Sequence, residues 1–172
     1  YAFNAATGAL AWTYTTGNSN VFNSPAVVNG VVYFGSGDGK LYALNAKSGK
    51  LLWTYTTPTG SGFTSSPAIA NGVVSIGAGD GNLYAFNAKT GVLEWTFSGY
   101  TIESSSALAD SVIYVGSRDH DLYALDATTG ILLWTSISGN SDESSPTIAN
   151  GVIYIGSEDS NLYAFHLPGT SP

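Results

Sequence analysis

Residues 41–53, LYALNAKSGKLLW, form a unit that recurs along the whole chain and decides its fold. Two β-rich runs, LYAL and LLW, flank a short polar turn that contains glycine, which predicts two antiparallel strands. The unit returns at residues 83–95 and 122–134. A copy without the leading leucine opens the chain at residues 1–12, and a broken copy ends it at residues 162–166. The tryptophans that close the copies are therefore spaced by 41, 42 and 39 residues: Trp12, Trp53, Trp95 and Trp134.

Each period holds four strand signals and no helical periodicity. In the first full period these signals are residues 26–28, 31–34, 41–44 and 51–55, and Asn29-Gly30 is a strong hairpin turn between the first two. The middle strands are apolar on consecutive residues, so both of their faces are expected to be buried, as in a blade that lies between two other blades. A two-layer sandwich would instead alternate apolar and polar residues. The sequence predicts an all-β fold, a β-propeller with about four blades of four antiparallel strands.

The repeats predict one propeller domain over residues 1–172, or part of one. The repeat units are expected at about residues 1–16 (partial), 23–57, 65–98, 104–137 and 144–166 (partial). The last unit lacks an outer strand, whereas the first fragment is an outer strand without a blade. We expect the missing strand to come from the N-terminus, from a neighbouring chain or from blades upstream of Tyr1. Closure within one chain is disfavoured because Tyr1-Ala2-Phe3 and Tyr163-Ala164-Phe165 are both third-strand segments.

The turn and tryptophan of the repeat carry a family resemblance. Ala43, Asn45, Ser48-Gly49 and Trp53 together resemble the tryptophan-docking motif of the pyrroloquinoline-quinone (PQQ)-like repeat β-propellers. The resemblance implies that each tryptophan packs between adjacent blades. Quinoprotein dehydrogenases and the outer-membrane barrel-assembly lipoprotein are framed by the same motif, so the fold alone does not name a function. Independently of the resemblance, four repeated glycines are expected in the left-handed conformation at the turn, and they are Gly8, Gly49, Gly91 and Gly130.

Composition excludes several classes of partner. The formal net charge is −7, from 12 acidic against 5 basic residues, which argues against nucleic acid and against an anionic membrane surface. The chain has no cysteine, hence no disulfide and no thiolate site. No apolar run approaches the roughly 20 residues of a membrane span. A content rich in Ser, Thr, Asn, Gly and Tyr favours an extracytoplasmic location (secreted, cell surface or periplasmic). Because the chain begins at Tyr1 inside a repeat, we expect it to be processed or cut from a longer one.

The sequence shows no catalytic residue and no metal site. An aspartate recurs in the second hairpin of every unit, which fits a turn cap better than a repeated metal site: Asp38, Asp80, Asp119 and Asp159. His120 and His166 are too isolated for a nucleophilic triad or a metal pair. A PQQ-dependent dehydrogenase needs an aspartate base and a Ca²⁺ ion that is held by a carboxylate and an amide. The docking motif aligns no residue of this chain with those positions. Neither PQQ nor Ca²⁺ is expected as a cofactor.

The loops that enter the inner strands depart from the repeat and are the candidate binding positions. In a propeller these loops ring the central channel, so Glu103, Asp142 and Glu143 are expected at its rim. Two interpretations remain open: solvated acids on a loop, or an acidic mouth that binds a cation, a sugar or a basic peptide.

Three functions remain as hypotheses. The leading one is a non-catalytic extracytoplasmic scaffold or binding domain that mediates protein interaction or assembly, including a homo-oligomer formed by strand complementation. The second is a fragment of a PQQ-dependent quinoprotein dehydrogenase. The third is a carbohydrate-binding surface that uses tyrosines such as Tyr100.

Overall fold

Antiparallel strands supply all of the regular structure that the computed structural model describes, which covers residues 1–17, 19–99, 101–137 and 144–167. Those residues contain no helix, and therefore none that is long and apolar enough to cross a membrane. The strands are β1 (Ala2–Phe3), β2 (Leu10–Trp12), β3 (Ala26–Val28), β4 (Val31–Gly35), β5 (Lys40–Asn45), β6 (Leu51–Thr56), β7 (Ala68–Ala70), β8 (Val73–Gly77), β9 (Asn82–Asn87), β10 (Leu93–Ser98), β11 (Ala107–Ala109), β12 (Val112–Gly116), β13 (Asp121–Asp126), β14 (Leu132–Ile137), β15 (Thr147–Ala149), β16 (Val152–Gly156) and β17 (Leu162–His166).

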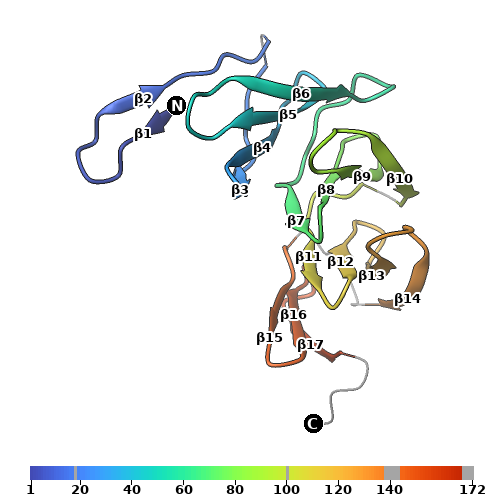
Figure 1. Cartoon of the computed structure of the whole chain (residues 1–172). Helices are drawn as coiled ribbons and strands as arrows, with labels where there is room; N and C mark the ends of the chain where they lie inside the picture. Colours follow the sequence, from blue (N-terminus) through green and yellow to red (C-terminus); the bar gives the residue numbers. More distant parts are fainter. Residues whose placement is uncertain (18, 100, 138–143, 168–172) are drawn as a thin grey trace.

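These strands form successive blades. The first three blades are four-stranded sheets, β3–β6, β7–β10 and β11–β14, and the fourth is the three-stranded sheet β15–β17. The hairpin β1–β2 is a separate two-stranded sheet. Figure 1 shows the four blades following one another around an arc, with β3, β7, β11 and β15 on its inner side. The prediction of an all-β propeller with four blades is confirmed.

The local sequence explains the tight turns of each blade. In the β3–β4 hairpin, Asn29 and Gly30 have φ angles of 50° and 76°, and two positive φ angles in a two-residue loop match the twist of the flanking strands. Asp110 and Ser111 adopt the same conformation, with φ angles of 48° and 64°. The four-fold recurrence of this turn gives every blade the same short inner strand.

The core lies between the blades, so the second and third blades are buried on both faces. We call the face toward the following blade the forward face and the opposite one the backward face. Leu41 and Ala43 lie on the forward face of the first blade and pack against Val74, Ile76 and Phe86 on the backward face of the second. Similar clusters join the second blade to the third and the third to the fourth. This explains the consecutive apolar residues of the middle strands.

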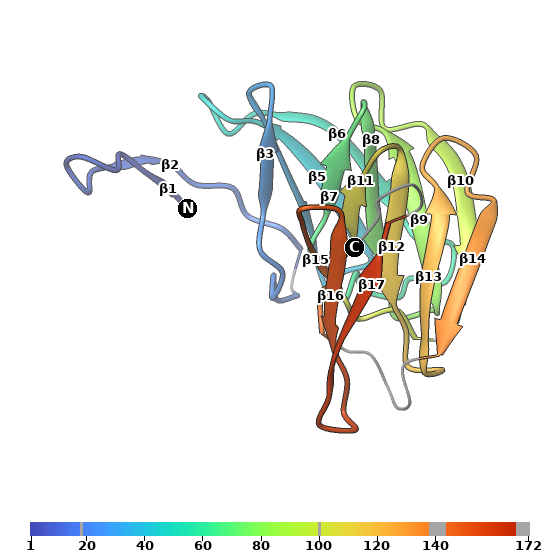
Figure 2. The ribbon, with the colours of Figure 1, turned by 90° about the horizontal axis from the view of Figure 1, so that it is seen from below.

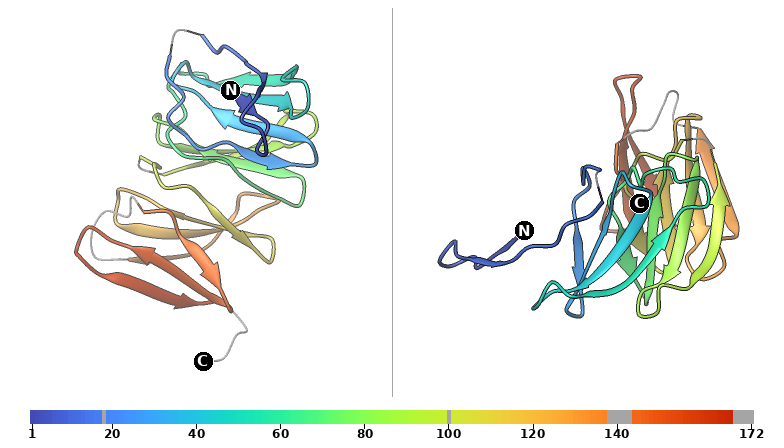
Figure 3. Two further views of the ribbon diagram at one scale, coloured as in Figure 1. Left: turned by 90° about the vertical axis from the view of Figure 1, so that its left-hand side faces the viewer. Right: turned by 90° about the horizontal axis from the view of Figure 1, so that it is seen from above.

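The arc does not close on itself. Figures 1 and 3 place the N-terminal hairpin beyond the first blade, at the end of the arc opposite the fourth blade. Figure 2 shows the same separation from below. In this structure the N-terminal strand of the chain therefore does not complete its own last blade. A neighbouring chain and upstream blades remain as the other sources of the missing strand.

Candidate functional site

The repeated tryptophans connect each blade to the next. Trp12, Trp53 and Trp95 donate hydrogen bonds from Nε1 to backbone oxygens of the following blade over 2.9, 3.0 and 3.1 Å. The acceptors are Ala46, Ala88 and Ala127. The ring of Trp134 lies 5.9 Å from that of Tyr114 and 6.5 Å from that of Phe165, between centroids.

The turn glycines lie directly against these rings. Gly49, Gly91 and Gly130 have φ angles of 69°, 71° and 71°, and an added Cβ would lie 2.6–2.7 Å from Cδ2 of the preceding tryptophan. Gly8 has the same conformation, with φ 70°, but no described atom lies within 4 Å of an added Cβ there. The glycine serves both the turn and the close approach of the ring, a second requirement that the sequence pattern alone did not reveal.

The recurring aspartates are engaged within their own hairpins. Asp38 accepts hydrogen bonds from the hydroxyl of Tyr42 at 2.6 Å and from the backbone N–H of Lys40 at 3.1 Å. Asp80, Asp119 and Asp159 repeat the tyrosine bond with Tyr84, Tyr123 and Tyr163. The Asp-x-x-x-Tyr spacing is visible in the sequence and was the signal that sequence reasoning missed.

The electrostatics of these pairs follow from burial and hydrogen bonding. Burial, followed by the bond to Asp80, raises the pKa of Tyr84 to about 12. Burial acts to raise the pKa of Asp38, but the hydrogen bonds from Tyr42, Ser36 and two backbone N–H groups together hold it below its usual value. Across the described ranges, no three His, Cys, Asp or Glu side chains come together in a way that could hold a metal ion.

Serines link the blades around the inner side of the arc. The backbone N–H of Ser24 donates to Oγ of Ser66 at 3.0 Å, that of Ser66 to Ser105 at 2.9 Å, and that of Ser105 to Ser145 at 3.0 Å. We call these four residues the serine ladder. The serine ladder gives three successive blade interfaces the same hydrogen bond.

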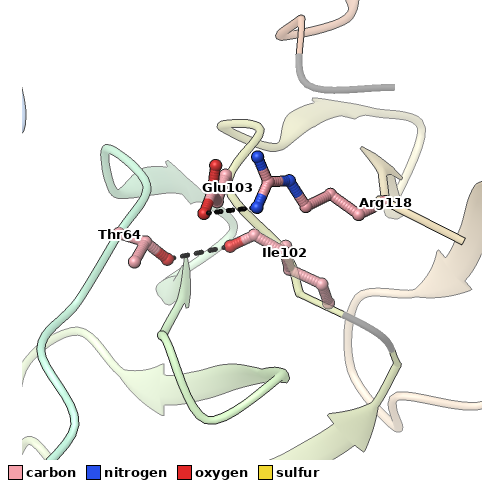
Figure 4. Close-up of polar contacts among 4 residues, drawn as sticks. All are labelled: Thr64, Ile102, Glu103 and Arg118. Atoms are coloured by element: carbon pink, nitrogen blue, oxygen red, sulfur yellow. Dashed lines mark hydrogen bonds and ion pairs between the residues drawn. The ribbon is translucent and has the colours of Figure 1, made fainter. Parts of the chain in front are cut away.

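The candidate binding position Glu103 lies at the edge of an open recess of about 640 Å³ between the loops of the first three blades. Its Oε1 is 3.6 Å from Nη1 of Arg118, and the two side chains are 36% and 47% exposed. Figure 4 shows this ion pair beside the hydrogen bond from Thr64 Oγ1 to the backbone oxygen of Ile102, which measures 2.9 Å. Phe22 also lines the recess and is 84% exposed. We call this surface the rim recess.

Sequence reasoning placed Glu103 at the rim but missed Phe22 and Arg118, because single residues outside the repeat carry no periodic signal. Asp142 and Glu143 lie outside the described residues, so the acidic mouth that they were to form with Glu103 stays a prediction. Tyr100, the residue named for carbohydrate binding, also lies outside the described residues. The described residues therefore place the exposed ring of Phe22 and the Glu103 carboxylate, which is paired with Arg118, at one recess.

Known proteins share both the repeat and the fold. A family model described as the outer membrane protein assembly factor BamB matches residues 1–105 and, in a second match, residues 98–169. No curated protein matches the sequence significantly. BamB from Moraxella catarrhalis is similar, with a TM-score of 0.83 and 22% identity over 95% of this chain and 52% of that one.

Two further solved structures extend the comparison. The computationally designed Ika4 protein gives a TM-score of 0.82 at 18% identity, over 94% of this chain and 99% of that one. The quinohemoprotein alcohol dehydrogenase ADHIIG from Pseudomonas putida HK5 gives 0.70 at 22% identity, over 81% of this chain and 28% of that one. These identities show the fold alone. The chain spans about half of the length of the Moraxella protein.

Proposed function

The chain belongs to the BamB family of PQQ-like repeat β-propellers, and on that premise we propose that it is a non-catalytic extracytoplasmic scaffold or binding domain for protein interaction and assembly. The family is that of an outer membrane protein assembly factor, which supports both the role and the location. The observation that carries the proposal is Phe22, a large aromatic side chain that is 84% exposed in the rim recess. Exposed aromatic residues at the edge of a concave surface are typical anchors of protein partners.

The rim recess fits an extended peptide segment of a partner. Its volume of about 640 Å³ lies within the range of ordinary ligand sites. Phe22 offers an apolar surface to a partner side chain, and the Glu103 carboxylate, with several lone pairs, can accept hydrogen bonds from basic or N–H groups in addition to its contact with Arg118. These two side chains are complementary to a peptide that contains basic and aromatic residues.

Peptide binding tests the site. The probe is a panel of fluorescent 12-residue peptides that alternate apolar and basic residues, and the readout is anisotropy on titration with the full chain. Phe22→Ala should weaken the best binder about tenfold or more, which corresponds to about 1.4 kcal/mol or more. Leu52→Ala is the matched control, since Leu52 is a 50% exposed apolar residue of outer strand β6 and should leave affinity unchanged. Equal affinity for Phe22→Ala and wild type would contradict the assignment.

A catalytic role is the second candidate, because the fold is shared with the quinohemoprotein alcohol dehydrogenase at a TM-score of 0.70. The test mixes the chain with PQQ, Ca²⁺, an artificial electron acceptor and a series of alcohols and sugars. We expect no substrate-dependent reduction of the acceptor dye. Alcohol- or sugar-dependent reduction would overturn the non-catalytic assignment.

A further inference from the structure

The outer strands of the first three blades begin with exposed apolar residues. Strands β6, β10 and β14 lie on the outer side of the arc (Figure 1), and each is the edge of its sheet. Within one residue of the first position of these strands, seven large apolar side chains are 36–63% exposed: Leu51, Leu52, Val92, Leu93, Ile131, Leu132 and Leu133. We call these seven residues the outer belt. Exposed apolar residues that gather on one surface mark an interaction site, whereas single ones do not.

The contacts between blades bring the parts of the outer belt together. Trp53 of β6 lies against Gly91, the residue directly before Val92. Trp95 of β10 lies against Gly130 in the same way. The start of each outer strand is therefore held beside the start of the next, and the outer belt runs from the first blade to the third.

The turns beside the outer belt carry most of the basic charge of the chain. Only five residues are basic, and three of them lie in the turns directly before β6 and β10: Lys47, Lys50 and Lys89. All three side chains are exposed, and no described side chain forms an ion pair with them. The outer belt is therefore bordered by cationic groups that are free to contact carboxylates of a partner.

The acidic groups near the outer belt are engaged within their own hairpins. Glu94 accepts a hydrogen bond from Nδ2 of Asn87 at 3.1 Å, and Asp126 accepts one from the backbone N–H of Thr129 at 2.8 Å. Asp110 belongs to the inner β11–β12 hairpin. Other acidic residues of these blades lie at the opposite ends of the strands, in or next to the β4–β5, β8–β9 and β12–β13 hairpins: Asp38, Asp80, Asp119 and Asp121. The two ends of the blades therefore differ in charge.

We propose that the outer belt and its three lysines form a docking surface for a protein partner whose contact segment carries carboxylates between apolar side chains. The apolar side chains of the segment cover the leucines, and its carboxylates pair with the lysines. A nucleic acid would leave the seven apolar side chains uncovered, and the net charge of −7 opposes binding to an anionic membrane. The rim recess lies at the opposite end of the blades, so this surface goes beyond the proposed function and does not depend on it.

Binding of acidic peptides tests the lysines. The probe is a panel of fluorescent 12-residue peptides that alternate apolar residues with glutamate, titrated with the full chain at about 50 mM salt, where exposed charges are weakly screened. Lys89→Glu should weaken the best acidic binder about fivefold or more. Lys40→Glu is the matched control, because it makes the same change of charge at the opposite end of the first blade and should leave the affinity unchanged. Equal effects of the two substitutions would overturn the proposal.

A crossed comparison separates this surface from the rim recess. Leu52→Ala should weaken the acidic peptide roughly threefold or more and leave the basic peptide unchanged, whereas Phe22→Ala should do the reverse. Acidic binding that survives Phe22→Ala while no basic peptide binds would support this inference and contradict the proposed function. Acidic peptides that bind no more tightly than basic ones, or that lose their affinity in Phe22→Ala, would overturn this inference.

Cross-linking locates the bound peptide. The chain contains no cysteine, so a benzophenone group attached at Val92→Cys labels one position of the outer belt. On illumination it should capture the acidic peptide. The same group at Val27→Cys should not, although both valines are 60% exposed, because Val27 lies on inner strand β3. Equal capture at both positions would overturn the location. Co-sedimentation with phosphatidylglycerol vesicles, without binding of any acidic peptide, would overturn the proposal in favour of a membrane.

Discussion

Replacing Gly91 by alanine should destabilise the chain far more than the same change at Gly72, although both glycines lie in the second blade with positive φ angles, of 71° and 80°. The difference isolates the contact between a turn glycine and a tryptophan ring. At Gly72 an added Cβ meets nothing within 4 Å. At Gly91 it would lie 2.6 Å from Cδ2 and 2.7 Å from Cε3 of Trp53.

The magnitudes follow from these distances. Holding alanine in the left-handed conformation costs roughly 1–2 kcal/mol at either position. At Gly91 the Trp53 ring must also move by about 1 Å to regain van der Waals contact, which costs roughly 1–3 kcal/mol in disturbed packing. That movement also breaks the 3.0 Å hydrogen bond from Nε1 to Ala88, a net loss of about 1 kcal/mol. We expect about 3–6 kcal/mol for Gly91→Ala and about 1–2 kcal/mol for Gly72→Ala.

Urea denaturation followed by tryptophan fluorescence measures both values, and the thermal midpoints should differ by about 10 °C. A double-mutant cycle sharpens the test, because the excess cost of Gly91→Ala should vanish when Trp53 is already alanine. Two single variants that agree within about 0.5 kcal/mol in the wild-type background would refute the reasoning.

Three other changes test separate parts of the fold. Trp95→Ala should cost about 3–5 kcal/mol, because it removes a packed ring and the donor to Ala127; an unchanged denaturation midpoint would contradict this. Ser106→Pro should stabilise by about 1 kcal/mol, because the buried Ser106 hydroxyl has no partner among the described residues and the other three blades have proline there; a lower thermal midpoint would argue against it. Tyr84→Phe should make the free energy of unfolding less dependent on pH in the alkaline range. In the folded protein the pKa of Tyr84 is raised to about 12 from its ordinary value near 10.0. The stabilisation from this shift is therefore complete below pH 10 and is lost as the pH rises through 12. Equal slopes for both proteins in denaturation at pH 9 to 12 would refute this assignment.

The repeat made most of the frame predictable from the sequence. Asn29-Gly30 indicates a hairpin through its own conformational preferences, and the recurrence of Gly91 and Trp95 locates turns and outer strands. Such signals depend only on nearby residues, so they can be recognised in the sequence without knowing how the blades stack. The contact of Trp53 with Gly91 is different in kind, because it depends on how one blade stacks on the next.

The candidate site was less predictable for a physical reason. Glu103 was found as a departure from the repeat, but its pairing with Arg118 joins two loops whose approach depends on the stacking of the blades. The sequence places Phe22 in the loop before the first inner strand, but only the structure shows that its ring is 84% exposed. Sequence reasoning also treated the aspartates as simple turn caps, because it looked for metal spacing and not for tyrosine four residues later.

The serine ladder makes one blade interchangeable with another. Every junction in the ladder joins a backbone N–H, which any amino acid except proline provides, to the hydroxyl of the next blade. These hydrogen bonds therefore do not require a specific pair of residues at each blade interface. Duplication or loss of one complete unit of about 40 residues leaves a chain whose junctions still agree. The number of blades can thus change during evolution while the hydrogen bonds between neighbouring blades stay the same.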